Sequence, residues 1–183
     1  AIYGIAAALG TTTVVLNLVD LELGETVYTA SFENPQRFGG SDIMNRISYD
    51  GGPDAGELQA VMVSSINFEI GEMVRALKIR RRQIYEIVAV GNTTMREIFF
   101  GIDVQSIGTR PYKSSVEDEF RASKRPTTAL STTAARLGLR IHPKATVYGG
   151  PLIASHLGAD VAADLLALGM EDRTDPVILI DVG

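Results

Sequence analysis

The first twenty residues hold the pattern that most restricts how this chain can fold. Two apolar runs, 2–9 and 13–20, are joined by the turn Gly-Thr-Thr-Thr at 10–13, and each run is long enough for a strand. β-branched residues are concentrated from 11 to 15, which favours extended backbone. The pattern therefore predicts a β-hairpin whose tip exposes one glycine, three hydroxyls and several backbone amides.

The hairpin tip has two interpretations. Gly10 lets the backbone approach a ligand closely, and the amides of the turn could surround a phosphate. The alternative is an ordinary hairpin turn, in which the threonines serve only the strand propensity of the flanking segments. Both interpretations stay open on this stretch alone.

Composition and charge exclude several classes of function. The chain has 183 residues, 45% apolar and 21% charged, which is typical of a soluble globular domain with a real core. Its formal net charge of −5 offers no basic footprint, so we expect neither a nucleic-acid nor a membrane partner. No cysteine is present, and His142 and His156 lack a second ligand at metal-binding spacing. Without a run of about eighteen apolar residues, the expected location is cytoplasmic.

The residues after the hairpin predict one more strand and two helices. Alternation over 26–32 predicts a third strand and hence an antiparallel meander. Ser41 is the expected N-cap of a short helix over 42–49. A long helix should run from about 55 to 80, because apolar residues recur there at spacings of three and four. These are Leu58, Met62, Ile66, Ile70, Met73 and Leu77.

A second glycine-containing turn follows the apolar strand predicted over 84–90. Gly91 opens it, hydroxyl and amide side chains come next, and helical spacing then begins. A strand, a glycine turn and a helix start form a second candidate ligand loop. The alternative is that Asn92 or Thr93 only caps the helix.

The C-terminal half continues with shorter elements. An irregular but ordered excursion is expected over 101–130, followed by a helix over 131–137 and a strand over 145–148. A helix over 157–168 follows, with Val161, Leu165 and Leu168 turned inward. The apolar segment 176–183 is predicted to be one more strand.

This order of elements predicts an α/β fold built on a mixed five-stranded sheet, with an antiparallel meander first and parallel strands afterwards, covered by helices. The loops at Gly10, Gly91 and Gly149 should gather on one rim, where ligands of open α/β sheets bind. That convergence favours the phosphate interpretation of the first loop.

Seven stretches occur in the order found in one known family, and together they cover almost the whole chain. They are 4–13, 34–39, 42–47, 91–95, 110–112, 158–160 and 180–183. The order of elements resembles the first, ribonuclease H-like lobe of the superfamily of acetate and sugar kinases, actin and seventy-kilodalton heat-shock chaperones. Within this actin-like superfamily, the seven stretches resemble the ATP-dependent reductive activators of corrinoid proteins.

The resemblance implies a two-lobed ATPase that uses ATP and Mg²⁺ and returns a Co(II) corrinoid to Co(I). The implied partner is a corrinoid protein of a methyltransferase system. The family also implies an electron-supplying [2Fe-2S] domain, which we expect to be absent from this cysteine-free chain. Residues 1–175 would form the first lobe, and 176–183 would be the first strand of a second lobe. Left unpaired, the strand at 177–180 would fold back or associate with another copy.

The first loop takes its role from this resemblance. Gly10, Thr11, Thr12 and Thr13 match the family's first phosphate loop, whose amides and hydroxyls would hold the β- and γ-phosphates. The family places a metal-holding aspartate just before this loop, where the present chain has Ala8. An alanine cannot bind a hydrated cation, so this position departs from the family pattern.

The other implied site residues come from two further loops. Asp181 and Gly183 match the start of the second phosphate loop. The Asp181 carboxylate is the implied catalytic group, holding Mg²⁺ through water or orienting the attacking water. Asn92, Thr93 and Thr94 would line the cleft from the first lobe.

Two other functions stay open. A small-molecule kinase of the same superfamily would transfer the γ-phosphate to a hydroxyl, but the sequence has no clear sugar-binding signature. A non-catalytic module could keep the fold and dock a partner protein, which the alanine at position 8 favours. As an isolated piece, the chain is expected to be inactive.

Overall fold

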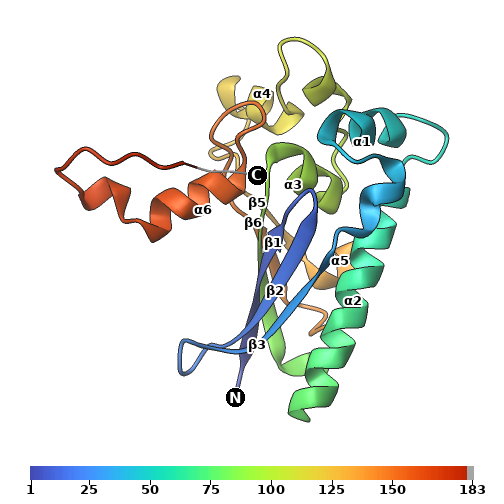
Figure 1. The fold of residues 1–183 in the computed structure, drawn as a ribbon, viewed down its shortest axis with the longest axis vertical. Coiled ribbons are helices and arrows are strands. Elements are labelled where there is room, and N and C mark those ends of the chain that lie inside the picture. Colours follow the sequence, from blue (N-terminus) through green and yellow to red (C-terminus); the bar gives the residue numbers. More distant parts are fainter. Residues whose placement is uncertain (181–183) are drawn as a thin grey trace.

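The computed structural model describes residues 1–180 and is organised around one open sheet (Figure 1). The sheet has six strands in the order β3-β2-β1-β4-β6-β5. They are β1 (Tyr3–Leu9), β2 (Thr13–Asp20), β3 (Glu25–Glu33), β4 (Ile84–Val90), β5 (Leu130–Thr133) and β6 (Thr146–Gly149).

The strand directions confirm the predicted mixed sheet. β1, β2 and β3 form an antiparallel meander, while β4 is parallel to β1 and β6 is parallel to β4. The sequence prediction of five strands missed β5, which pairs antiparallel with β6. The helix expected over 131–137 is shortened to α5 (Ala134–Leu137). The hydroxyl-bearing residues that precede α5 adopt the strand instead, because they suit extended backbone and complete the ladder on β6.

Five further helices of residues 1–180 lie between and after the strands. They are α1 (Ile43–Asp50), α2 (Glu57–Leu77), α3 (Thr93–Phe100), α4 (Ser115–Arg121) and α6 (Ala159–Ala167). Four 3₁₀ turns connect them: η1 (Pro35–Gly39), η2 (Arg81–Gln83), η3 (Gln105–Gly108) and η4 (Met170–Asp172). The predicted N-cap of α1 was one residue early: the Oδ1 atom of Asp42, not the Ser41 hydroxyl, accepts from the Asn45 amide at 2.9 Å. The excursion over 101–130 contains η3 and α4 between its turns.

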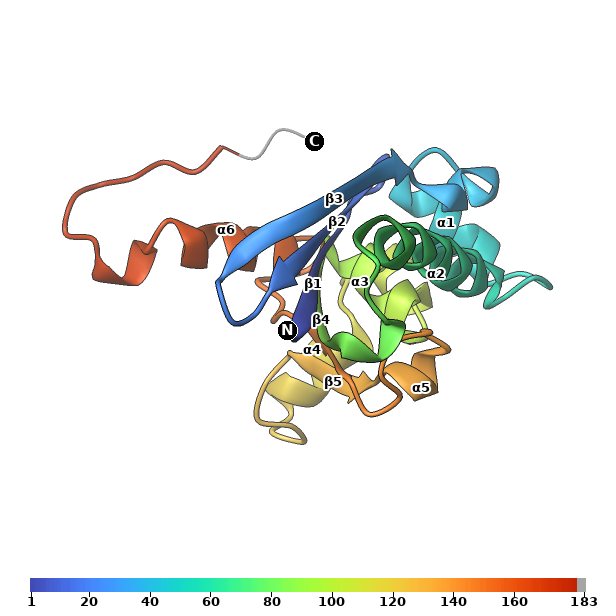
Figure 2. The same ribbon diagram turned by 90° about the horizontal axis from the view of Figure 1, so that it is seen from below.

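The core lies between one face of the sheet and α2. Five of the six predicted apolar positions of α2 are buried, and Leu77 is partly buried against the same cluster. α2 and α3 lie on this face, and α6 lies on the other side of the sheet (Figure 2). The second face exposes small and aromatic side chains, among them Ala6, Ala8 and Tyr148.

The C-terminal part differs from this packed body, because α6 and η4 project away from the sheet and the residues after η4, up to 180, run back toward it (Figure 1). Within α6 only Ala159 is buried, and Leu168, predicted to face inward, is 38% exposed. Residues 176–180 form no strand, and Ile178 and Ile180 are 85% and 76% exposed. That segment pairs with none of the six described strands. Among the helices of residues 1–180, none is long and apolar enough to cross a membrane.

Candidate functional site

Three loops meet at one edge of the sheet, as the sequence predicted. β1, β4 and β6 run in the same direction, so their carboxyl ends lie together. The loops touch there: the Asn92 Nδ2 atom donates to the Thr11 Oγ1 atom at 3.0 Å. The Gly150 amide donates to the Ala89 carbonyl at 3.3 Å. The edge therefore assembles side chains that lie about eighty residues apart in sequence.

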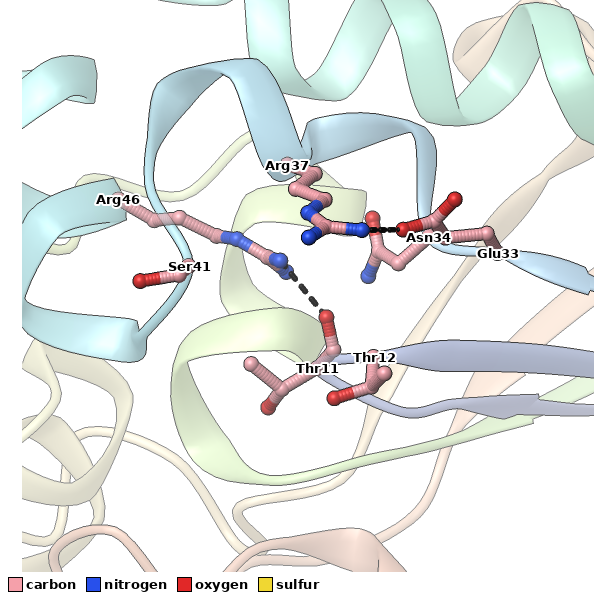
Figure 3. Close-up of a pocket in the computed structure, with 7 residues that line it drawn as sticks. All are labelled: Thr11, Thr12, Glu33, Asn34, Arg37, Ser41 and Arg46. Atoms are coloured by element: carbon pink, nitrogen blue, oxygen red, sulfur yellow. Dashed lines mark hydrogen bonds and ion pairs between the residues drawn. The ribbon is translucent and has the colours of Figure 1, made fainter.

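The first loop is held along its carbonyl side. The Gly10 carbonyl accepts from the Asn34 Nδ2 atom at 2.7 Å, and the Thr12 carbonyl accepts from the backbone N–H of Asn34, also at 2.7 Å. Between them, the Thr11 carbonyl accepts from the Arg46 Nη2 atom at 2.7 Å (Figure 3). Three consecutive carbonyls are thus bound on the side where Asn34 and Arg46 lie.

Peptide geometry decides what the other side of this loop presents. In a trans peptide the N–H points opposite to the C=O of the same unit, so the amides of Thr11, Thr12 and Thr13 point away from Asn34 and Arg46. Position 10 must be glycine, since a Cβ there would collide with the Thr13 carbonyl. Amides that point away from Asn34 and Arg46, in a turn that also carries hydroxyls, are donors that suit an anion such as a phosphate.

Local sequence explains why the two anchoring side chains lie there. Asn34 is the N-cap of η1, where its Oδ1 atom accepts from the Gln36 amide at 2.8 Å and leaves Nδ2 free for the loop. Arg46 extends from α1, and its Nε atom donates to the Gly40 carbonyl at 3.0 Å. Arg46 is 1% exposed. Burial lowers the pKa of its guanidinium and the Asp42 carboxylate opposes that shift, but an arginine stays protonated in proteins.

A hollow of about 200 Å³ lies on this carbonyl side of the loop (Figure 3). Its lining residues come from the hairpin, η1 and α1: Thr11, Thr12, Glu33, Asn34, Arg37, Ser41 and Arg46. Arg37 forms an ion pair with Glu33. The sequence prediction assigned no role to Asn34 or Arg46. The available signals were an Asn-Pro helix start and a lone arginine before an apolar helical position.

The second loop behaves differently from the first. Asn92 caps α3, with its Oδ1 atom accepting from the Met95 amide at 3.0 Å, so the capping interpretation is confirmed. Thr93 and Thr94 are 0% and 1% exposed, and their hydroxyls have no hydrogen-bond partner among the described residues. Gly158 packs against this loop so closely that a Cβ would collide with its backbone.

Thr93 and Thr94, two of the three residues predicted to line the cleft, are therefore buried among the described residues, and their cleft role stays a prediction. The Thr93 amide donates to the His156 carbonyl at 3.4 Å, so the turn formed by 154–158 covers the start of α3. Asn92 is the exception, because it reaches Thr11 at the open edge. The sequence could not reveal this covering turn, since it comes from a segment about sixty residues later.

The structure places some of the remaining predicted site residues and does not describe the others. Asp181 and Gly183 lie outside the described residues, so their roles stay predictions. Thr13 is exposed at the start of β2 and does not line the hollow. Ala8 is exposed on β1, between Val15 and Val90 on the neighbouring strands.

The described part of the site fits an anion better than a cation. Residues 1–180 contain no group of three or more His, Cys, Asp or Glu side chains that could hold a metal ion. The first loop supplies amides and hydroxyls, and the Glu33 carboxylate beside it is already paired with Arg37. Hydrated Mg²⁺ prefers carboxylate ligands, and the loop residues 10–13 supply none, so their hydroxyls and amides suit an anion.

Comparisons with known proteins identify the family. The family described as "RACo middle region" matches residues 3–173. The corrinoid activation enzyme RamQ of Eubacterium limosum is 31% identical over 184 residues, which cover 100% of this chain and 29% of that enzyme. A solved structure described as a reductive activator for corrinoid, iron-sulfur protein has a TM-score of 0.85 and 31% identity, over 95% of this chain and 26% of that one. The chain spans less than a third of either relative. It belongs to the RACo middle-region family.

Proposed function

We propose that this chain is the first lobe of an ATPase that activates a corrinoid protein reductively. In the full-length protein, ATP hydrolysis would drive an electron onto a Co(II) corrinoid and return it to Co(I). The first lobe would hold the β- and γ-phosphates, and a second lobe would close over the nucleotide. The family of this chain and the names of the two similar proteins support the corrinoid part of this proposal.

The observation that carries the nucleotide part is the conformation of the first loop. Three bound carbonyls leave the amides of 11–13 pointing to the opposite side, next to the Thr11 hydroxyl. Backbone amides arranged in this way recognise phosphate oxygens without a charged side chain. The loop therefore has the chemistry needed to bind and orient the transferred phosphoryl group.

Magnesium would enter this site through the nucleotide. When bound, Mg²⁺ neutralises charge on the phosphates and polarises the reacting phosphoryl group. The present chain would contribute Asp181, either through a water ligand of the metal or by orienting the attacking water. Position 8 supplies no second carboxylate, because it is an alanine.

The same alanine supports a second candidate function, a non-catalytic lobe that docks a partner protein. Ala8 is exposed on β1, where an aspartate side chain would have room. A lobe that bound nucleotide weakly could still use the actin-like fold to hold a corrinoid protein. The two candidates differ in whether corrinoid reduction depends on ATP.

One titration of the full-length protein separates these functions. ATP and a Co(II) corrinoid protein are added with an electron donor, and Co(I) absorption is followed together with phosphate release. We expect Co(I) to appear only with ATP, with hydrolysis stimulated by the corrinoid protein. Binding of the corrinoid protein with neither hydrolysis nor Co(I) would support the docking lobe. A phosphorylated small molecule would instead indicate a kinase.

We also propose that the apolar segment 177–180 associates with a partner strand. Ile178 and Ile180 are exposed, and an exposed segment with the apolar pattern of a strand can add to the edge of a sheet. Light scattering of the 183-residue chain tests self-association: a concentration-dependent dimer is expected. A strict monomer at all concentrations would contradict pairing between copies.

A further inference from the structure

We propose that Asn34 and Arg46 are positioning residues of the first phosphate loop. The Asn34 side chain binds the Gly10 carbonyl and the Arg46 side chain binds the Thr11 carbonyl, while the backbone amide of Asn34 binds the Thr12 carbonyl. Held in this way, the loop would present the amides of 11–13 to the nucleotide. Neither side chain needs to touch the phosphate itself. This inference rests on the proposed function, because it assumes that the loop binds a phosphate.

The Asn34 and Arg46 side chains lie next to each other, because both contact the sulfur of Met95. The Arg46 Nη1 atom lies 3.2 Å from the Met95 Sδ atom, and the Asn34 Nδ2 atom lies 3.8 Å from the same sulfur. Met95 belongs to α3, where its amide is bound by Asn92, and Asn92 also donates to the Thr11 hydroxyl. The loop is therefore fixed by η1, α1 and α3 together, and a shift of one anchor is transmitted to the loop.

Asn34 and Arg46 each make a set of hydrogen bonds that the most similar amino acid could not make. Asn34 must donate to the Gly10 carbonyl and accept from the Gln36 amide, so it needs both halves of its amide. A carboxylate of the same shape would keep the acceptor but place a negative oxygen against the Gly10 carbonyl. Arg46 donates to the Gly40 and Thr11 carbonyls at once, which its planar fork allows. A lysine ammonium carries the same charge without that geometry.

Asn34→Asp in the full-length protein is the first test. Positioning predicts at least a tenfold rise in the dissociation constant for ATP, measured by calorimetry. Asn17→Asp is the matched control on the same hairpin, because the Asn17 Oδ1 atom accepts from the Thr29 hydroxyl at 2.8 Å and a carboxylate still accepts. Affinity unchanged in Asn34→Asp, or reduced equally in the control, would overturn the proposal.

Arg46→Lys is the second test, because it separates charge from geometry. If Arg46 acts by holding the Thr11 carbonyl, the lysine variant loses ATP affinity at least tenfold although the charge is retained. If Arg46 acts only by attracting an anion, the lysine variant binds ATP as well as the parent, and the positioning role is wrong. This variant also decides the question if Asn34→Asp does not fold.

Hydrogen exchange without nucleotide gives a readout that is independent of the proposed function. In the folded variants, peptides covering 8–16 should exchange several times faster than in the parent, while peptides from α2 stay unchanged. If the parent protein binds no ATP, the proposed function is wrong. The positioning role is then tested only by the amide hydrogen exchange of peptides covering 8–16. Unchanged exchange over 8–16 in both variants would overturn the positioning role whatever the ATP result.

Discussion

The loops 10–13 and 91–94 have similar compositions and lie at the same edge of the sheet, yet they differ in how far their threonines are exposed. Each follows a parallel strand, begins with glycine and contains adjacent threonines. In the first loop Thr12 is exposed and Thr11 is partly exposed. In the second, Thr93 and Thr94 are buried beneath the turn formed by 154–158.

The difference teaches that packing decides how such a loop can function. The first loop has its carbonyls bonded to Asn34 and Arg46, and we propose that its amides bind a ligand. In the second loop the Thr93 amide donates to the covering turn, the Asn92 side chain caps α3, and Asn92 also contacts the first loop through Thr11. Glycine and threonine at the end of a strand are therefore not sufficient evidence for a ligand loop.

Gly10→Ala should have the largest effect on this comparison. A Cβ at position 10 collides with the Thr13 carbonyl, so the loop must change conformation. We expect ATP affinity of the full-length protein to fall about a hundredfold, or about 2.7 kcal/mol, by calorimetry. Gly24→Ala is the control in the turn between β2 and β3: its φ of +73° makes alanine unfavourable, but nothing lies within 4 Å of the added methyl group and the turn is at the opposite end of β2. Equal losses in both variants would contradict a specific role for the first loop.

Gly158→Ala tests the covered loop. The added methyl group would collide with the backbone of 91–93, so the turn over α3 must move. We expect about 2 kcal/mol lower stability, measured by urea unfolding. Gly138→Ala is the comparison: its φ of +74° makes alanine unfavourable, but only Val63 lies near, so about 1 kcal/mol is expected. A smaller loss for Gly158→Ala than for Gly138→Ala would show that the cover is loose.

Ala8→Asp sharpens the role of the first loop in catalysis. A carboxylate at this exposed position would restore a ligand for hydrated Mg²⁺. We expect Mg²⁺-dependent ATP hydrolysis by the full-length protein to rise about tenfold, or about 1.4 kcal/mol. Ala6→Asp places the same charge two residues earlier on the same exposed face and should leave the rate unchanged. An unchanged rate in Ala8→Asp would remove this interpretation of position 8.

A paired threonine substitution should give opposite signs in the two loops. Thr11→Val removes the acceptor for Asn92 and should cost about 1 kcal/mol of stability. Thr94→Val removes a buried hydroxyl that has no partner among the described residues, and should add up to about 1 kcal/mol. Thermal unfolding measures both. Destabilisation by both valines would mean that Thr94 is satisfied in solution and that the loops are less different than proposed.

Much of the fold could be predicted because it follows from local periodicity. The hairpin, the long apolar stripe of α2 and the strand β4 are each encoded by side chains that are close in sequence. β5 could not be predicted, because residues 130–133 adopt a strand only where β6 offers its edge. For the segment 176–180 the prediction was wrong in the other direction. Its apolar pattern predicted a strand, but it forms no strand among the described residues.

The sequence by itself determined the antiparallel meander, the long helix α2, the convergence of the loops and the glycine at position 10. These depend on alternation, helical spacing and turn chemistry, which act over a few residues. Only the tertiary structure decided that Asn34 and Arg46 hold the first loop and that Gly158 covers the second. Such contacts join residues 24 to about 65 positions apart, and local patterns do not determine which distant segments pack together.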